Sequence, residues 1–190
     1  MISEFDASSS TLHLLVWQAL RTYTIDALLA LLEDKDPIVR TAVARELQTR
    51  GGVKVFEIAL ARCDDPGADA REIGAFILGQ LGTPDFPFRS QSIPRLVDLA
   101  ISDLSSEVRA AAVAALGHLR AVEAKDALFK AAHDISADVR AMAAVSIGGL
   151  GATTDVLQVL DELIHDEVNE VREWAELGLD IATGSEQPAV

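Results

Sequence analysis

The sequence holds one cysteine in 190 residues, and aromatic side chains make up only 5% of it. Because Cys63 has no partner cysteine, an intramolecular disulfide is excluded, and this usage fits a reducing compartment. Apolar runs long enough to span a membrane, about 18 residues or more, are also lacking. The chain begins with the acidic segment M-I-S-E-F-D, which is unlike a basic signal peptide. We therefore expect a cytoplasmic location and no binding to membranes.

Basic residues are scarce as well: 16 Lys and Arg stand against 30 Asp and Glu, for a net charge of −14. A groove that neutralises nucleic-acid phosphates needs clustered cations, so we expect no nucleic-acid partner. High negative charge favours basic protein partners, although it also simply keeps a protein soluble. The charge is concentrated after residue 150, where ten acids accompany a single base, Arg172.

Sequence motifs of catalysis and metal binding are lacking too. The four histidines are scattered, with neither H-E-x-x-H spacing nor a cysteine cluster beside them. The chain has no G-x-x-x-x-G-K-[ST] phosphate loop, no G-x-G-x-x-G after a predicted strand and no G-x-S-x-G. Cys63 stands beside Asp64 and Asp65, and negative neighbours disfavour a reactive thiolate. We expect no catalytic residue, no metal and no cofactor, and therefore not an enzyme.

What the sequence does have is a pattern that occurs five times. Each copy is centred on an arginine, and successive arginines are 31, 38, 31 and 32 residues apart. An aspartate precedes each arginine by six residues, a small or medium residue follows it by three, and Leu or Ile follows it by seven. A fixed period of this length is typical of a solenoid built from stacked helix pairs. The arginines are Arg40, Arg71, Arg109, Arg140 and Arg172, and the aspartates are Asp34, Asp65, Asp103, Asp134 and Asp166.

The period predicts an all-α fold, a right-handed α-solenoid of five helix pairs in one domain over residues 1–184. Apolar residues three and four apart predict a first helix, A, and a second helix, B, in each repeat. A helix over 9–22, capped by Ser9 or Ser10, is expected to close the open end, and residues 185–190 are expected to be disordered. The long second spacing places an inserted loop at 83–92, where prolines oppose a helix. The repeats cover residues 25–51, 53–82, 93–120, 123–151 and 154–183.

The recurring aspartate and arginine favour a structural role. The aspartate falls in the A-to-B turn, where its carboxylate can accept hydrogen bonds from the N–H groups that start helix B. The arginine, one turn into helix B, can reach the aspartate of the neighbouring repeat. We therefore expect the five pairs to form a ladder along the stack, because a catalytic carboxylate would not need to recur in every repeat.

The concave face of a solenoid of this kind is lined by its B helices, and the side of these helices that points away from the core is the candidate binding surface, which we call the B face. It consists of the positions two before and one, five and eight after each ladder arginine. This face carries a recurring acidic edge beside a smoother strip of alanine, glycine and larger apolar residues. Charge beside apolar area is typical of a protein-binding groove, although acids near a helix N-terminus also favour the helix dipole without any partner. The predicted contacts are Asp69, Glu72, Phe76, Glu107, Asp138, Val145, Glu170, Glu173, Leu177 and Asp180.

The inserted loop offers a second candidate contact. Its large side chains, Phe86, Phe88 and Arg89, are unusual for a loop. Insertions in repeat proteins often lie on the binding side. A loop that folds its two phenylalanines back onto the solenoid is the alternative.

The pattern D-x-x-x-x-V-R-x-x-A-x-x-x-L-G, with its 31-residue spacing, resembles the HEAT-like repeats named after phycobilisome lyases over residues 25–183. Segments 44–52 (A-R-E-L-Q-T-R-G-G), 71–81 and 171–175 (V-R-E-W-A) are similar to the YibA group of bacterial HEAT-repeat proteins. The broader resemblance implies a solenoid that serves as a lyase, an enzyme scaffold or a binding protein. The YibA resemblance implies immunity against Rhs-type toxins, many of them nucleases, but it supplies no binding motif to carry over.

These observations lead to the hypothesis of a non-catalytic module that binds a basic protein on its acidic B face. An immunity-type inhibitor that covers a basic toxin domain is its sharper form. A phycobilin lyase or lyase subunit is the enzymatic alternative, and it predicts cations for the propionates of a tetrapyrrole, whereas the B face has few besides Arg45. A general assembly scaffold is the third possibility.

Overall fold

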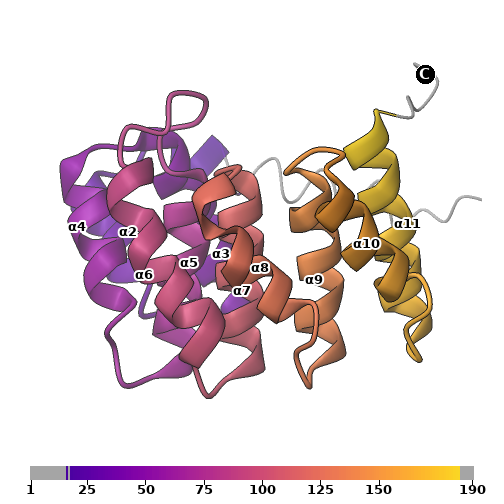
Figure 1. Cartoon of the computed structure of the whole chain (residues 1–190). Coiled ribbons are helices and arrows are strands. Elements are labelled where there is room, and N and C mark those ends of the chain that lie inside the picture. Colours follow the sequence, from indigo (N-terminus) through magenta and orange to yellow (C-terminus); the bar gives the residue numbers. More distant parts are fainter. Residues whose placement is uncertain (1–15, 17, 185–190) are drawn as a thin grey trace, which may run out of the picture.

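The computed structural model describes residue 16 and residues 18–184 (Figure 1). Residues 16 and 18–20 are helical, as expected for the end of the capping helix. The expected cap at Ser9 or Ser10, the rest of the helix over 9–15, and the tail 185–190 lie outside the described residues.

The described chain is an all-α solenoid, and it contains no strand within that part. Its helices alternate between two layers, with the A helices in one layer and the B helices in the other (Figure 1). The A layer consists of α2 (Ile25–Leu31), α4 (Val53–Arg62), α6 (Arg89–Ser102), α8 (Lys125–Ala131), which follows the 3-10 turn η1 (Val122–Ala124), and α10 (Thr154–Leu163). The B layer consists of α3 (Pro37–Arg50), α5 (Ala68–Gln80), α7 (Ser106–His118), α9 (Ala137–Gly148) and α11 (Asn169–Thr183).

Two of the B helices, α3 and α7, begin at a residue whose side chain caps the helix. The Asp36 carboxylate accepts a hydrogen bond from the Ile38 N–H at 2.9 Å, and Pro37 occupies the first helical position, which needs no N–H. The Ser105 hydroxyl accepts from the Val108 N–H at 3.3 Å. These local signals fix the starts of α3 and α7.

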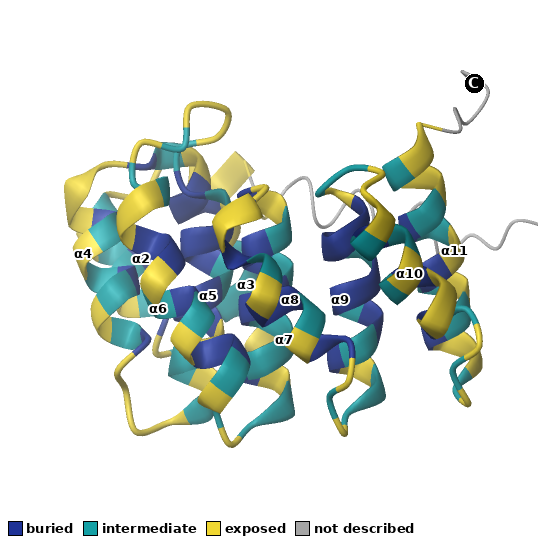
Figure 2. Cartoon of the chain, in the orientation of Figure 1, coloured by how far each residue is buried: buried dark blue, intermediate teal, exposed yellow. Residues whose placement is uncertain are grey.

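The core lies between the two layers, where Figure 2 shows the buried residues. The apolar residue seven positions after the ladder arginine is fully buried in the first four repeats, as Leu47, Leu78, Leu116 and Ile147. In the fifth repeat the equivalent Leu179 is only partly buried. Each repeat therefore relies on the next to cover its apolar face, as expected for a solenoid.

Neighbouring B helices approach each other through glycine. A Cβ added to Gly79 would lie 2.7 Å from the Ala115 Cα, and one added to Gly148 would lie 2.8 Å from the Gly178 Cα. Successive B helices contact each other more extensively than successive A helices do, which makes the B layer the tighter side of the stack. The sequence predicts that Gly79 and Gly148 lie on the exposed strip of the B face. This prediction is wrong at both positions, because the adjacent helix covers both residues.

The inserted segment is shorter than the expected loop over 83–92, because helix α6 already begins at Arg89. The Phe88 carbonyl accepts hydrogen bonds from the N–H and the hydroxyl of Ser92, both at 2.9 Å, which starts the helix. Pro94 lies inside α6. Its missing N–H leaves only the carbonyl of Ser90 without a helical donor, and Ser90 is exposed to water. The non-helical part of the inserted segment therefore covers only residues 83–88.

The close helix contact predicts that Gly148→Ala destabilises the protein. The added methyl group would collide with the backbone of Gly178, so we expect the free energy of unfolding to fall by about 1–3 kcal/mol. Urea unfolding followed by helical circular dichroism measures it.

Gly149→Ala is the matched control. Gly149 is exposed, has φ −67°, and its added Cβ would meet only the Ser146 oxygen at 3.4 Å. We expect a change below about 1 kcal/mol in the free energy of unfolding. Equal stability of the two variants would contradict the close packing of α9 against α11.

Candidate functional site

Three ladder arginines bind the aspartate of the next repeat through two parallel hydrogen bonds. Arg109 donates from Nε and Nη2 to the two carboxylate oxygens of Asp134, both at 2.7 Å. Arg140 does the same to Asp166 at 2.7 and 2.9 Å. The third pair, Arg71 and Asp103, repeats this geometry at 2.7 and 2.9 Å. Two-point pairing fixes the orientation of both groups, so it sets the register between repeats.

The same arginines also hold their own A-to-B turns. Arg109 Nη1 donates to the carbonyl oxygens of Asp103 at 3.0 Å and Leu104 at 3.3 Å. Arg140 Nη1 donates to Asp134 O at 2.8 Å and Ile135 O at 3.3 Å. Each ladder aspartate, through Oδ1, accepts the N–H two residues further on, just before helix B, rather than an N–H inside it. The ladder thereby links turns as well as side chains.

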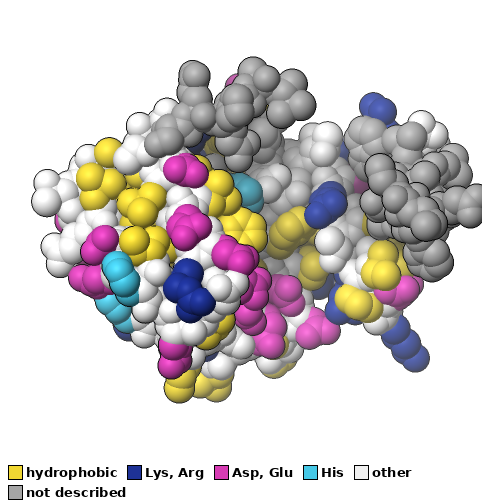
Figure 3. Space-filling model, turned by 90° about the vertical axis from the view of Figure 1, so that its right-hand side faces the viewer, with side chains coloured by type: hydrophobic (Ala, Val, Ile, Leu, Met, Phe, Trp, Pro, Cys, Tyr) yellow, Lys and Arg dark blue, Asp and Glu magenta, His cyan; other side chains and the backbone are white. Residues whose placement is uncertain are grey.

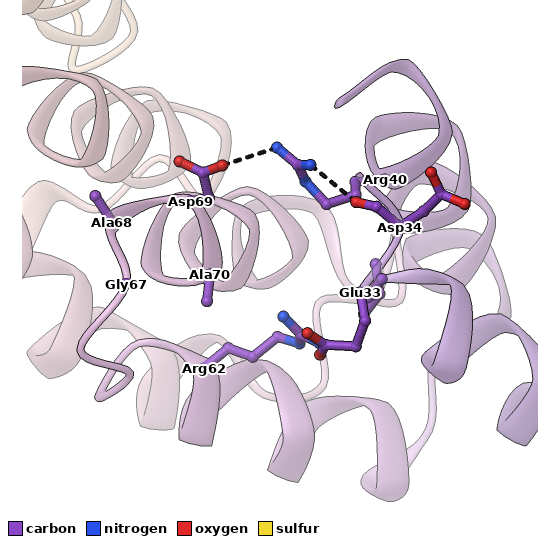
Figure 4. A pocket seen from close by; sticks show the side chains of 9 residues that line it. Glu33, Asp34, Arg40, Arg62, Gly67, Ala68, Asp69 and Ala70 are labelled. Carbon is purple, nitrogen blue, oxygen red and sulfur yellow. Dashed lines mark hydrogen bonds and ion pairs between the residues drawn. The ribbon is translucent and has the colours of Figure 1, made fainter. Parts of the chain in front are cut away.

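The first rung differs from the predicted ladder. Arg40 pairs with Asp69 at 3.0 Å instead of with Asp65, and Arg40 Nε is buried without a hydrogen-bond partner (Figure 4). The Asp65 carboxylate is exposed and accepts the Gly67 N–H at 2.8 Å. A pocket of about 350 Å³ lies here between the first two repeats, lined on one side by Arg40 and on the other by Gly67. The expected contact of Arg40 with Asp65 is therefore wrong, because the two repeats are not closed against each other at this rung.

The last rung has no following repeat in the described chain. Arg172 still binds its own turn through the carbonyl oxygen of Asp166 at 2.8 Å, and its Nη2 donates to the Asn169 side chain at 2.8 Å. A neighbouring residue of the same helix thus replaces the missing aspartate.

The ion pairs shift the acidity of the ladder carboxyls. Hydrogen bonds from Arg71 hold the pKa of Asp103 below its usual value, and those from Arg140 do the same for Asp166. Burial alone would raise the pKa of Asp134, but hydrogen bonds from Arg109 and from the Ser136 N–H outweigh it and lower that pKa. The ladder aspartates of the third to fifth repeats are therefore held in the ionised form.

On the B face the structure exposes every acid that the sequence predicts there. These acids are Asp69, Glu72, Glu107, Asp138, Glu170, Glu173 and Asp180. The apolar members Phe76, Val145 and Leu177 are only partly exposed. Acidic side chains gather in Figure 3, which views the end of the stack where α10 and α11 lie.

Glu72 shows that acids of neighbouring repeats influence each other. Its pKa is raised by partial burial and by the negative charges of Asp69 and Glu107. Glu107 itself has a lowered pKa because its carboxylate accepts hydrogen bonds from the hydroxyl of Ser105, at 2.7 Å, and of Ser106. On the B face, the negative charges of acids from the second and third repeats therefore influence one another.

Most cations lie away from this face, in ion pairs between adjacent repeats. The ladder pairs are supplemented by pairs in the A layer, such as Lys125 with Asp155 at 2.6 Å and Arg95 with Asp64 at 2.7 Å. Among the predicted B-face acids that the structure describes, only Asp69 forms an ion pair. The B face keeps its negative charge because the positive charges stabilise the stack instead.

A shallow pocket of about 310 Å³ opens on the first B helix, and the list of predicted contacts missed it. Its lining includes Ile38, Thr41 and Arg45. These are B-face positions of the first repeat, and Ile38 is 67% exposed. The sequence feature that marks this pocket is Ile38, an apolar residue at the position where the other four repeats carry an acid. The fourth B-face position of this repeat, Gln48, is buried and donates to the Phe76 carbonyl.

The side chains of the inserted segment already have partners within the chain. The ring of Phe88 stacks on Phe56 of α4 with centroids 4.5 Å apart. Arg89 donates to the carbonyl oxygen of Leu119 at 2.9 Å and to the Glu123 carboxylate at 2.6 and 2.8 Å. Phe86 is partly buried against the core. The alternative in which this segment folds onto the solenoid is the one that the structure has.

Cys63 is fully buried, and burial raises the pKa of its thiol to about 12. A thiol with this pKa is protonated at neutral pH and is a poor nucleophile. Among the described residues, no three His, Cys, Asp or Glu side chains come together as metal ligands do. None of the described helices has both the length and the apolar character to cross a membrane.

Residues 93–180 match the family of HEAT repeats. This match covers the last three repeats of the solenoid. The Escherichia coli (strain K12) protein YibA is 38% identical over 88 residues, which are 46% of this chain and 31% of YibA. The chain thus matches less than a third of the length of this curated relative.

Solved structures extend the likeness over most of the chain. The X-ray structure of E. coli YibA has 27% identity and a TM-score of 0.79, covering 92% of this chain and 63% of that one. The complex of CpcE and CpcF of phycocyanin lyase from Nostoc sp. PCC7120 has 22% identity and a TM-score of 0.67, covering 82% of this chain and 97% of that one. At 22% identity the second likeness concerns the fold alone.

The ladder geometry predicts unequal effects of two equivalent substitutions. Asp134→Asn removes the charge that Arg109 binds at two points, so we expect the free energy of unfolding to fall by about 1.5–3 kcal/mol. Asp65→Asn occupies the same repeat position, but its carboxylate binds no arginine, so we expect a loss below about 1 kcal/mol. Both variants keep an oxygen for the turn N–H. Urea unfolding measures the two values, and equal losses would contradict the open first rung.

The lowered pKa values of Asp103 and Asp166 predict a pH dependence. An unfolded aspartate titrates near about pH 3.9. Because the folded pKa lies lower, the stabilisation by each ion pair is fully present above that pH and is lost as pH falls through the folded pKa. We expect Asp103→Asn/Asp166→Asn to be less stable than wild type at neutral pH, with the difference shrinking in acid. Urea unfolding across a pH series tests this, and a constant difference would refute it.

Proposed function

We propose that this chain is a non-catalytic binding module whose B face takes a basic protein partner. The observation that carries the proposal is the separation of charge. Exposed acids from four successive repeats lie on the B face, whereas most cations are engaged in ion pairs between repeats. An unneutralised face of one sign steers and orients a partner of the opposite sign.

The apolar groups of the B face support a protein partner over a small basic ligand. Phe76, Val145 and Leu177 are partly exposed, and Ile38 borders a shallow pocket beside Arg45. Apolar area supplies affinity at protein interfaces, while charge supplies encounter rate and specificity. The first repeat carries Arg45 where the later repeats carry apolar residues, so a bound partner would meet a different charge at each end of the face.

The finer form of the proposal is an immunity-type inhibitor. The similarity to YibA motivates it, because the resemblance implies immunity against Rhs-type toxins. A toxin domain that acts on nucleic acid needs a positive surface, and an acidic B face would cover that surface. The test for this form is growth rescue when the chain is co-expressed with the toxin encoded next to it.

A charge reversal tests the B face directly. Glu107→Lys/Asp138→Lys/Glu173→Lys places cations in three successive repeats. We expect it to weaken binding of a labelled peptide of alternating lysine and serine by about tenfold or more at physiological salt. Fluorescence anisotropy measures the affinity. Capture from host lysate with the same variants then identifies the natural partner.

The control reverses three exposed acids of the A layer. Glu57, Asp98 and Asp126 lie on α4, α6 and α8 and form no ion pair in the described structure. Their triple change to lysine alters the net charge equally, but it acts from beyond the ~8 Å screening length, so we expect at most about threefold weakening. Equal weakening by both triple variants would show that only the net charge matters, and it would contradict the proposal.

A further inference from the structure

Two aliphatic side chains project into solvent from adjacent A-to-B turns. Leu104 is 97% exposed and Ile135 is 95% exposed, far more than any other large apolar residue that the structure describes. Each directly follows a ladder aspartate, so they occupy the same position in the third and fourth repeats. Single exposed apolar residues are ordinary, but a pair at equivalent positions of neighbouring repeats forms a patch.

The backbone beneath both side chains is held rigidly. The carbonyl oxygens of Leu104 and Ile135 accept hydrogen bonds from the ladder arginines Arg109 and Arg140, each at 3.3 Å. Those arginines are in turn bound at two points by the next repeat. The two side chains therefore stand on a backbone that loses little freedom when a partner binds, which favours affinity.

Acids flank this pair. Glu107 and Asp138 lie three residues further on, at the start of α7 and α9, and both are exposed without an ion pair in the described structure. Helices α7 and α9 contact each other, and packed helix axes lie about 8–10 Å apart. One segment of a partner can therefore reach both turns. Figure 1 shows the A-to-B turns along the lower edge of the stack, next to the ends of the B helices.

We propose that Leu104 and Ile135 are apolar anchors for the basic partner, so that its footprint extends from the B face over the edge formed by these two turns. This inference rests on the proposed function and adds the chemistry of the partner: a segment with cationic and large apolar side chains side by side. The cations pair with Glu107 and Asp138, and the apolar groups cover Leu104 and Ile135. Charge complementarity selects this occupant over an acidic or purely apolar one.

Two labelled peptides, alternating lysine with leucine and lysine with serine, test the anchors. We expect wild type to bind the leucine peptide about tenfold more tightly, because only leucine buries apolar surface on the two anchors. Leu104→Ser/Ile135→Ser should abolish this difference while leaving the affinity for the serine peptide unchanged. Methyl NMR provides a direct readout, since the Ile135 methyl resonances should shift with the leucine peptide.

Val53→Ser/Val122→Ser is the matched control. These valines are 60% and 63% exposed and lie at B-to-A junctions, on the opposite edge of the stack. We expect this variant to retain the full preference for the leucine peptide. A preference that persists in Leu104→Ser/Ile135→Ser, or that is lost equally in the control, overturns the assignment of the anchors.

A failure of the proposed function gives a different result from a failure of the two anchors. If the serine peptide binds wild type and the B-face charge-reversal variant equally, the acidic face is not the binding surface. The leucine peptide still decides the anchors in that case, because its affinity either does or does not depend on Leu104 and Ile135.

Discussion

The two-point ion pair between the arginine of one repeat and the aspartate of the next is the contact on which the rest of this structure depends. Burying two charges is costly, and a single buried pair seldom adds net stability over apolar packing. Here the cost is offset because Arg109 also donates to two backbone carbonyls and Asp134 also accepts a backbone N–H. The apolar core supplies most of the stabilisation, whereas the ladder determines how one repeat sits on the next.

The distribution of charge follows from this use of cations. Nine lysines and arginines pair with a carboxylate of an adjacent repeat, out of 16 in the whole chain. The same interactions that join the repeats therefore pair most of the positive charge with carboxylates. The acids that have no such partner keep their charge, on the B face and in the A layer alike. The net acidity of the surface and the cohesion of the stack thus have one physical origin.

The sequence predicts those parts of the structure that repeat. The solenoid, the helix pairs and three two-point rungs follow from residues at constant spacing, because equal spacing places equal side chains at equal positions. Spacing says nothing about the distance between particular repeats, so it gave no sign that Arg40 would meet Asp69 instead of Asp65. Spacing also predicts on which side of its own helix a residue lies, but not whether a neighbouring helix covers that side. Gly79 and Gly148 were therefore expected on the exposed strip, although neighbouring helices cover them.

Features that fall between the helical patterns were the hardest to predict. Leu104 and Ile135 lie in turns, where neither the helical period nor the ladder gives an apolar residue a role. The start of α6 at Arg89 was hidden by prolines on either side of it, although a proline is tolerated where the unpaired carbonyl faces water. In both cases the outcome depends on what surrounds the residue in space, which the local sequence does not contain.

The acids of the B face differ in how far folding alone accounts for them. Glu107 accepts a hydrogen bond from the hydroxyl of Ser105, the N-cap of α7, and Asp69 pairs with Arg40, so both have a local role. Glu72 has no such contact, and partial burial together with the negative charges of Asp69 and Glu107 raises its pKa. A cation from a partner placed beside Glu72 would relieve the repulsion, and the free energy released would contribute to binding.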